Sequence, residues 1–425
     1  MSDTHKTLVI GLFGFGVVGE GVYKVLKQTP SLKATIKKVC IKNPEKERDG
    51  PAELFTTDKR ELLDDAEINV IVEVINDADA AFEIVSEAMT NKKSVVSASK
   101  KMIAEHLCEL LILQQATKMS LLYEAAAGAS IPIIRNLEEY YDNDLLHSMR
   151  AIVNGSTNFI LTKMFTGNLN YFQALLLAKQ LGFAETDPVL DVEGHDAAHK
   201  WSFLLTHAFG IVVNHHTLVY TGIQRIDAGD ARFAAEKEYE IKLVAEAKKM
   251  ENDMIAAFVL PQFVNKTDPL AFVRDENNGV VIESGFADRQ FFYGKGAGSF
   301  PTASAILSDL SALRYDYKYE YKKLYHHAPC SLSNDFFLEV YVSYDSVRHV
   351  PTEQFAIIRT THRRQDRCYL IGTISFKTLQ NSTWWRDPDI SLIVMPDGVN
   401  HAAAAQLKLS AHRSVEENKY EYFPR

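Results

Sequence analysis

Cysteine is scarce in this chain, which has four in 425 residues: Cys40, Cys108, Cys330 and Cys368. They lie far apart and form no C-x-x-C pair, so the sequence indicates neither a disulfide framework nor a cysteine metal site. We expect reduced, mostly buried thiols. No apolar run approaches the length of a membrane span, and the first residues do not have the pattern of a signal peptide. These absences predict a cytoplasmic protein.

Excess positive charge is also absent. The formal net charge of -9 argues against a general nucleic-acid-binding or membrane-binding surface. The content of 46% hydrophobic and 24% charged residues is ordinary for a globular protein with a sizeable core. A chain of 425 residues is expected to form two or three domains.

The first third of the chain alternates short apolar runs with helical stretches. The runs are 8–13, 36–41, 70–75, 94–98 and 121–126. This alternation predicts βαβ units and a doubly wound parallel sheet, in which ligands bind at the carboxyl ends of the strands.

A glycine-rich segment follows the first apolar run directly: Gly14, Phe15, Gly16, Val17, Val18 and Gly19. A strand that leads through G-x-G-x-x-G into a helix is the usual way to hold a dinucleotide pyrophosphate. The glycines permit a tight turn and a close backbone approach, and the helix N-terminus offers free N–H groups to the anion. The alternative is a glycine-lined turn that binds nothing.

A second region begins near residue 132, where we expect a long helix to leave the sheet. Residues 150–295 mix helices with strands such as 254–259 and 280–284, which indicates an α+β domain. Another glycine-rich segment, 294–298, precedes a helix that runs to Leu313. Beyond residue 327, the runs 336–344, 369–376 and 390–395 predict the strands of a small C-terminal module.

The second predicted strand ends in Lys42 rather than in an acid. An acid at this point accepts hydrogen bonds from the ribose of NAD, whereas a cation favours the 2′-phosphate of NADP. Lys46 and Arg48 lie nearby. We therefore favour NADP, with NAD as the alternative cofactor. An equally good interpretation is that Lys42 is a solvated lysine at a strand end.

Five carboxylates fall within a dozen residues and are followed by Lys200: Glu185, Asp187, Asp191, Glu193 and Asp196. If a helix begins near Glu193, Asp196 and Lys200 share one face at i and i+4. Such a group can bind a substrate ammonium and present a lysine to an oxygen on which negative charge develops. The alternative is an acidic helix N-terminus with an ordinary surface ion pair.

Two further segments lie at predicted strand ends. Lys100 follows the strand at 94–98, which points it toward a bound nicotinamide, although the neighbouring Lys101 suggests a basic surface helix instead. The small-residue segment 123–132 could surround a hard cation with its carbonyls and Glu124. More often such a loop only allows close backbone packing.

Together these segments resemble homoserine dehydrogenase, over roughly residues 8–315. The resemblance rests on G-F-G-V-V-G, V-V-S-A-S-K, Y-E-A-A-A-G-A-S-I-P-I-I, N-G-S-T-N-F-I-L, L-G-F-A-E-T-D-P-x-x-D-V-E-G-x-D-A-A-x-K and G-K-G-A-G-S-F-P-T-A-S-A, in family order. It implies a reversible NAD(P)H-dependent reduction of L-aspartate-4-semialdehyde to L-homoserine, on the route to threonine and methionine. It also implies a homodimer or a higher homo-oligomer.

The resemblance assigns roles to individual residues. Lys200 matches the proton donor to the carbonyl oxygen, and Lys100 matches a lysine at cofactor and substrate. Glu185 and Asp196 match substrate-binding carboxylates, with Asp191 as a helper. Gly182, Gly296 and Gly298 match cofactor contacts. A structural sodium site is implied at Glu124 and the carbonyls of Ala127, Ala129 and Ile131.

The resemblance also implies a domain plan. A Rossmann-type nucleotide domain comprises residues 1–132 and is completed by about 295–325. Residues 133–294 form an α+β catalytic and dimerisation domain. Residues 327–425 form a small α+β module, where many family members carry an amino-acid-sensing ACT domain. This module could be a divergent ACT-like domain, a dimerisation element or something unrelated, because a clear D-x-P-G-x-L signature is missing.

The chain departs from the family pattern at Asn76-Asp77, at Ser99 and at Ala127-Gly128-Ala129-Ser130. These departures leave two alternatives to the dehydrogenase. One is a catalytically silent dinucleotide-binding sensor or partner subunit. The other is a dehydrogenase of a related amino-acid semialdehyde. The four residues Lys100, Glu185, Asp196 and Lys200 are all retained, which favours the active enzyme.

Overall fold

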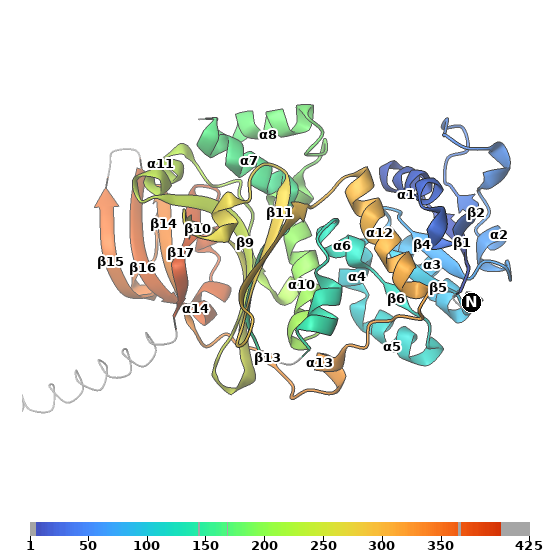
Figure 1. The fold of residues 1–425 in the computed structure, drawn as a ribbon. Coiled ribbons are helices and arrows are strands. Elements are labelled where there is room, and N and C mark those ends of the chain that lie inside the picture. Colours follow the sequence, from blue (N-terminus) through green and yellow to red (C-terminus); the bar gives the residue numbers. More distant parts are fainter. Residues whose placement is uncertain (1–5, 143–144, 168, 364–366, 401–425) are drawn as a thin grey trace, which may run out of the picture.

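Two β-sheets organise the chain in the computed structural model, which describes residues 6–142, 145–167, 169–363 and 367–400 (Figure 1). The N-terminal sheet is parallel, in the order β3-β2-β1-β4-β5-β6. Its strands are β1 (Leu8–Phe13), β2 (Ala34–Cys40), β3 (Phe55–Thr56), β4 (Val70–Glu73), β5 (Ser94–Ser97) and β6 (Leu121–Leu122). The central strands are almost wholly apolar because helices cover both faces of the sheet. The prediction of a Rossmann-type doubly wound sheet is confirmed.

The helices of this first region connect its strands. They are α1 (Val17–Gln28), α2 (Arg60–Leu63), α3 (Ala78–Thr90), α4 (Lys100–Glu105), α5 (Leu107–Thr117) and α6 (Glu124–Gly128). The chain order reverses between β1 and β4, the two inner neighbours from which the sheet grows outward. Ligands of such sheets bind outside the strand ends at this reversal.

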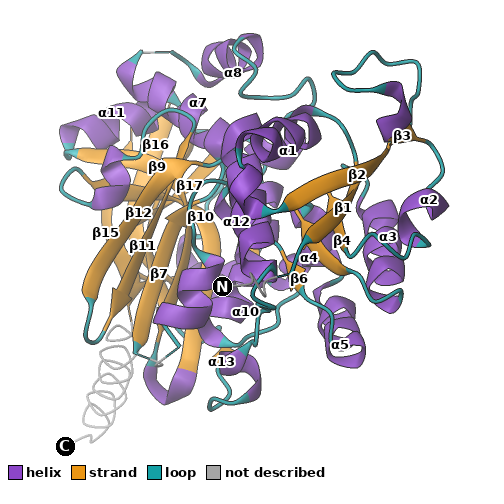
Figure 2. Ribbon diagram, turned by 45° about the vertical axis from the view of Figure 1, so that its right-hand side comes forward, coloured by secondary structure: helices purple, strands orange, loops and turns teal. Residues whose placement is uncertain are grey.

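The second sheet has eleven strands, nine of them in the order β12-β11-β7-β9-β10-β17-β14-β16-β15, while β8 and β13 pair with β10. Its strands are β7 (Leu146–Ile152), β8 (Val219–Tyr220), β9 (Tyr239–Lys249), β10 (Met254–Asn265), β11 (Asn277–Ser284), β12 (Asp288–Lys295), β13 (Ser331–Leu332), β14 (Phe337–Asp345), β15 (Phe355–Arg363), β16 (Arg367–Ser375) and β17 (Ile390–Asn400). Figure 2 shows this broad sheet on one side of the molecule and the smaller, helix-covered sheet on the other.

The remaining helices are α7 (Gly155–Thr166), α8 (Tyr171–Gln180), α9 (Val189–Val192), α10 (His195–Phe209), α11 (Ala228–Glu236), α12 (Ser299–Leu313), α13 (Lys322–Tyr325) and α14 (Phe376–Gln380). Helix α10 lies between the two sheets (Figure 1), and every residue in it except His195 is buried. A helix that is covered all round belongs to the interior. Its side chains therefore meet both halves of the molecule.

Helix α12 brings the chain back to the N-terminal sheet. It packs against α1, and the Ser299 hydroxyl donates to the Val17 carbonyl oxygen at 2.7 Å (Figure 1). Further along, the Ser120 hydroxyl donates to the carbonyl oxygen of Tyr317 at 2.8 Å. Residues 299–321 therefore lie against the first region, although they follow the strands of the second.

The strands near the C-terminus form an antiparallel subsheet in the order β17-β14-β16-β15. Thus β16 separates β14 from β15, and β14 separates β16 from β17. This is the split arrangement of a β-α-β-β-α-β unit. Helix α14 occupies the second helical position, and a 3₁₀ turn, η7 (Thr352–Gln354), occupies the first.

Several expectations were wrong in detail. The long helix expected from residue 132 is a short segment that includes one π-helical stretch, η3 (Asn136–Tyr140). The sequence analysis did not predict β15, whose side chains are mostly exposed. All four cysteines are free, as expected, but only Cys368 is buried, and Cys108 is exposed. In the part of the chain that is described, no helix is both long and apolar enough to cross a membrane.

Candidate active site

A cavity of about 450 Å³ brings together side chains from widely separated elements. Its lining includes Lys100 from the start of α4, Asp196 and Lys200 from α10, and Glu185 from the loop before α9. Eight of the site residues that the sequence predicted line this cavity: Lys100, Gly182, Glu185, Asp191, Asp196, Lys200, Gly296 and Gly298. The fold thus gathers at one place residues that are up to 198 positions apart in the chain (from 100 to 298).

Asp196 is the centre of this cavity's polar network. Its carboxylate accepts the Lys100 ammonium at 2.8 Å on one oxygen and the Lys200 ammonium at 3.0 Å on the other. Asp196 and Lys200 are i and i+4 on α10, and both side chains are only 5–6% exposed. This burial argues against an ordinary surface ion pair. Lys200 also donates to the carbonyl oxygen of Val153 at 2.6 Å.

The local backbone explains why α10 starts where it does. Gly194 precedes the helix with φ of +85°, a left-handed conformation that favours glycine. A methyl group there would also lie 2.8 Å from the carbonyl oxygen of Thr221. The glycine thus lets the acidic loop pack closely and places Asp196 in the first turn, where the helix dipole favours a carboxylate.

Burial and charge act in opposite directions on these groups. Burial by itself would raise the pKa of Asp196, but the cations of Lys100 and Lys200 hold that pKa well below its ordinary value. Burial lowers the pKa of Lys200 against the opposing pull of Asp196. The Asp196 charge raises the pKa of Lys100. Of the two lysines, Lys200 is therefore the better suited to give up and regain a proton.

Asn154 is a site residue that the sequence analysis missed. Its side-chain oxygen accepts the Thr157 N–H and caps α7. This leaves its amide nitrogen to donate to Asp196 at 2.9 Å and to Asp191 at 2.7 Å. The N-G-S-T segment carried a usable signal, because an asparagine before a helix has one free end once it caps.

The rim of the cavity is more exposed than its centre. Glu185 is exposed, Asp191 is half-buried, and Gly182 has φ of +77° with no atom near its missing methyl group. Gly296 and Gly298 come from the loop between β12 and α12, beside Lys295 and Glu276, two residues that the sequence analysis did not single out. The exposed carboxylates leave room for a ligand that reaches in toward the lysines.

The glycine turn after β1 lines a separate open cavity. Phe15, Gly16 and Val17 border it together with Lys46 and Arg48. Gly16 precedes α1 without any side-chain cap, so the first N–H groups of the helix are available to an anion. A methyl group on Gly19 would lie 2.2 Å from the Gly14 carbonyl oxygen, so this turn closes only around glycine. Val18 is the second residue of the helix.

The basic loop after β2 bears on whether the chain favours NADP or NAD. Lys42 is exposed at the end of the strand, while Lys46 and Arg48 line the open cavity beside Gly16. Arg48 Nε is buried and has no hydrogen-bond partner among the described residues. Arg48 is therefore better placed than Lys42 to meet a phosphate bound in this cavity.

The structure does not support the sodium site at Glu124. The Glu124 carboxylate accepts the backbone N–H groups of Ile133 and Ile134 at 2.6 and 2.7 Å, and that of Arg135 at 3.0 Å. Both of its oxygens thus cap the turn that follows. Ala127, Ala129 and Ile131, whose carbonyls the resemblance assigned to the sodium site, are buried. These contacts are consistent with close backbone packing, the alternative that the sequence left open.

Two departures from the family pattern have structural roles. Asp77 caps α3 by accepting the Ala80 N–H at 3.1 Å. Ser130 donates its hydroxyl to the Lys295 carbonyl oxygen at 3.0 Å, which ties the small-residue loop to the end of β12. Ser99 precedes α4 without a side-chain cap, and its N–H donates to the Ser97 hydroxyl. These substitutions leave the Lys100–Asp196–Lys200 network intact.

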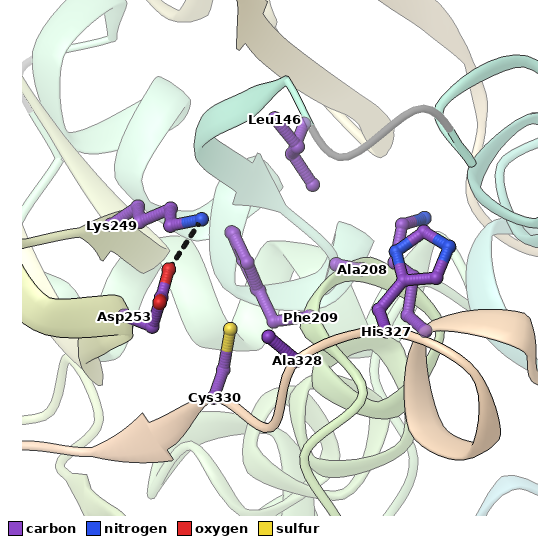
Figure 3. A pocket seen from close by; sticks show the side chains of 9 residues that line it. Leu146, Ala208, Phe209, Lys249, Asp253, His327, Ala328 and Cys330 are labelled. Carbon is purple, nitrogen blue, oxygen red and sulfur yellow. Dashed lines mark ion pairs between the residues drawn. The ribbon is translucent and has the colours of Figure 1, made fainter.

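A second cavity, of about 200 Å³, lies at the other end of α10. Figure 3 shows Lys249 and Asp253 paired at one side of it, with the Cys330 sulfur below them and His327 on the opposite side. The Lys249–Asp253 distance is 2.9 Å, and the Lys323 ammonium donates to the carbonyls of Leu137 and His207. This cavity is smaller than the one at Asp196, and none of the site residues that the sequence predicted lines it, so it is the weaker candidate for chemistry.

Comparison with known protein families matches almost the whole of the region that carries both glycine segments. Residues 14–124 match the model described as homoserine dehydrogenase, NAD binding domain, and residues 132–311 match the model described as homoserine dehydrogenase. A homoserine dehydrogenase of Bacillus subtilis is 37% identical over 317 residues, which cover 72% of this chain and 73% of that protein. One from Corynebacterium glutamicum is 36% identical, with 71% and 70% covered.

Solved structures extend the likeness to the C-terminal strands. A homoserine dehydrogenase from Thiobacillus denitrificans has a TM-score of 0.80 at 27% identity, with 92% of this chain and 98% of that chain covered. A hyperthermophilic archaeal homoserine dehydrogenase in complex with NADPH has a TM-score of 0.63 at 26% identity, with 73% and 99% covered. This chain belongs to the homoserine dehydrogenase family of oxidoreductases, whose N-terminal domain binds a nicotinamide dinucleotide.

Proposed function

We propose that this chain catalyses the reversible reduction of L-aspartate-4-semialdehyde to L-homoserine at the Asp196 cavity, with NADPH as the preferred reductant. The observation that carries the proposal is the buried carboxylate of Asp196 between the ammonium groups of Lys100 and Lys200. Bound nicotinamide supplies the hydride in such reactions, while the protein supplies orientation and electrostatics.

The residues around the cavity have complementary tasks. The carboxylates of Glu185 and Asp191 would bind the substrate ammonium at the rim, where they are not fully paired with protein cations. Lys100 and Lys200 would face the substrate oxygen, whose negative charge increases during reduction. Asp196 positions both lysines, and Asn154 holds Asp196 in turn.

Lys200 is the proposed proton donor in the reducing direction. It must carry a proton when the alkoxide forms, and it must be neutral to accept a proton when homoserine is oxidised. Its buried position lowers its pKa, which makes the loss of that proton easier. Lys100 is half-exposed and keeps its positive charge through Asp196, which suits a group that stabilises charge.

The preference for NADP rests on the basic loop after β2. Arg48 and Lys46 line the cavity beside Gly16, and Lys42 is exposed nearby. A 2′-phosphate gains from charge-assisted bonds with such cations. Gly182, Gly296 and Gly298 are proposed to contact the same cofactor where the two cavities approach the α12 N-terminus.

The domain plan and assembly are further proposals. Helix α12 packs against α1, which supports completion of the nucleotide domain by residues after 295. The split order of β14 to β17 supports a divergent ACT-like module, to be tested by L-threonine titration of activity and melting temperature.

The sheet edge at β12 exposes Tyr293, at 54%, and supports a homodimer through this domain. Sedimentation equilibrium tests that assembly. A cytoplasmic location stays a prediction.

The decisive experiment follows reduced-nicotinamide absorbance during homoserine oxidation at alkaline pH. Wild type is compared with Lys200→Ala, each with NADP and NAD. We expect turnover that prefers NADP and falls roughly 10²- to 10⁴-fold in the variant, the usual contribution of a positioned acid–base group. Lys101→Ala, an exposed neighbour of Lys100, is the matched control.

The same assay separates the alternatives. Cofactor binding without turnover would favour the silent sensor, which the named relatives do not favour. Turnover only with a homologous amino alcohol would favour a dehydrogenase of a related semialdehyde. Full activity in Lys200→Ala would remove the proposed role of that lysine.

A further inference from the structure

Two buried histidines lie in contact with each other beside the α10 turn that carries Lys200. His199 is on α10, and His215 begins the 3₁₀ turn η4 (His215–Thr217). Their exposed fractions are 7% and 4%, and their ring centroids are 4.4 Å apart. Buried, uncharged imidazole rings in contact are the side chains that divalent transition metals prefer.

Glu105 completes a three-residue group. One ligand atom from each of Glu105, His199 and His215 lies within 4.8 Å of the other two. Glu105 is the last residue of α4 and is exposed, so it gives an entering ion access to the buried pair. Ligands bound about 2.0 Å from a tetrahedral zinc ion lie roughly 3.3 Å apart. The Glu105 carboxylate therefore has only a short distance to swing inward.

One of these histidines also has an unsatisfied ring nitrogen. His215 Nδ1 is buried and has no hydrogen-bond partner within the described part of the chain. Buried polar atoms are normally paired, so such an atom calls for a ligand. Imidazole binds a metal ion through a ring nitrogen that carries no proton.

We propose that Glu105, His199 and His215 form a binding site for a divalent transition metal ion, with zinc as the best fit. Two histidines and one carboxylate leave the fourth tetrahedral position to water. Among the described residues, Glu105 pairs with the Lys101 ammonium at 3.6 Å. This is a surface pair, which stabilises little and yields readily to a metal ion.

The site would join the two halves of the molecule. Glu105 ends the helix that Lys100 begins, whereas His199 is the neighbour of Lys200 on α10. A bound ion would therefore hold together the two helices that carry the lysines of the Asp196 network. Metal binding itself is independent of the proposed reaction and can be measured without turnover.

The test is a titration of the full-length chain, free of any affinity tag and stripped by a chelator, with Zn²⁺ by calorimetry and with Co²⁺ by visible absorption. We expect one equivalent per chain, the intense absorption of tetrahedral cobalt, and a higher melting temperature with zinc. His215→Ala and Glu105→Gln should weaken binding by more than the roughly 10- to 100-fold that loss of an outer-shell partner costs. Glu105 is exposed, so its variant tests the site without disturbing the core.

Two controls make the result specific. His216→Ala removes an exposed histidine beside His215, and Asp79→Asn removes a member of the neighbouring exposed group Asp79, Glu105 and His106. Both variants should bind zinc like the wild type. The proposal is overturned if binding is not saturable, if it survives His215→Ala and His199→Gln, or if Asp79→Asn abolishes it.

Discussion

Two candidate binding regions, the proposed nucleotide half at the glycine turn before α1 and the proposed substrate half at the Asp196 cavity, are built on different principles. The nucleotide half uses backbone: Gly14, Gly16 and Gly19 shape a turn whose recognition groups are N–H donors at the start of α1. The substrate half uses buried charge, with Asp196 between two lysines. Backbone donors do not titrate, whereas buried charges do. The first half should therefore be sensitive to added side-chain volume, and the second to lost charge and to pH.

The largest effect is expected from Asp196→Asn. Removal of the shared carboxylate leaves Lys200 buried without its counter-charge, so the free energy of unfolding should fall by about 3–5 kcal/mol at pH 7. The folded-state pKa of Asp196 lies below its ordinary value of 3.8, so this wild-type advantage exists above about pH 4 and declines as pH falls further. Urea unfolding at several pH values measures it.

The same variant should shift the pH–rate profile. The charge of Asp196 raises the pKa of Lys200, so its removal should move the rise of homoserine oxidation to lower pH. Asp191→Asn is the matched control, because Asp191 bonds to Asn154 but makes neither lysine contact of Asp196. Identical profiles for the two variants would contradict the central position of Asp196.

Glu73 is one exception that sharpens the comparison, because it is a fully buried carboxyl group in the nucleotide half. Burial raises its pKa from 4.5 to about 7, although the Ser97 hydroxyl and the Ile75 N–H both favour the ionised form. Because the folded state holds the Glu73 proton more tightly than the unfolded state does, the free energy of unfolding is highest below pH 4.5. It falls as the pH rises toward 7, where the buried carboxyl group must ionise.

Glu73→Gln should therefore gain stability relative to the wild type between pH 5 and pH 8, by up to about 3 kcal/mol. Chemical denaturation at the two pH values measures the difference. If the gap between variant and wild type is the same at both, Glu73 does not titrate in this range.

Gly19→Ala and Gly16→Ala test the volume sensitivity of the nucleotide half. The Gly19 methyl group would meet the Gly14 carbonyl oxygen at 2.2 Å, while the Gly16 methyl group meets nothing within 4 Å. We expect Gly19→Ala to destabilise the fold by about 1–3 kcal/mol and to weaken cofactor binding. Gly16→Ala should weaken cofactor binding with an unchanged melting temperature. Equal melting temperatures for the two variants would show that the turn tolerates the extra volume.

The smallest effect is expected in the basic loop. Replacing Arg48 by alanine should weaken NADP relative to NAD by about 1 kcal/mol, the usual net value of one hydrogen bond. Lys42→Ala should change the preference less, because Lys42 lies at the exposed strand end. Ratios of kcat/KM for the two cofactors decide this, and a larger effect at Lys42 would restore it as the main phosphate contact.

Local patterns were the most predictable. The first strand was predicted at 8–13, where β1 lies, because a continuous apolar run next to G-x-G-x-x-G has few other interpretations. The Asp196–Lys200 pair followed from helical spacing alone. By contrast, residues 239–249 contain Glu, Lys and Ala, which favour helix, yet they form β9 because β7 and β10 pair with both of its edges.

The sequence by itself determined the family of the protein, because each motif is a short segment whose residue types and spacing can be recognised without the structure. Only the tertiary structure decided which motifs meet. Lys100 reaches Asp196 because α4 packs on α10, and the pairing of His199 with His215 depends on a chain reversal after α10. The Glu124 carboxylate likewise caps a backbone turn nine to eleven residues away. Neither helical nor strand spacing in the sequence predicts such contacts, because they form only when distant segments pack together.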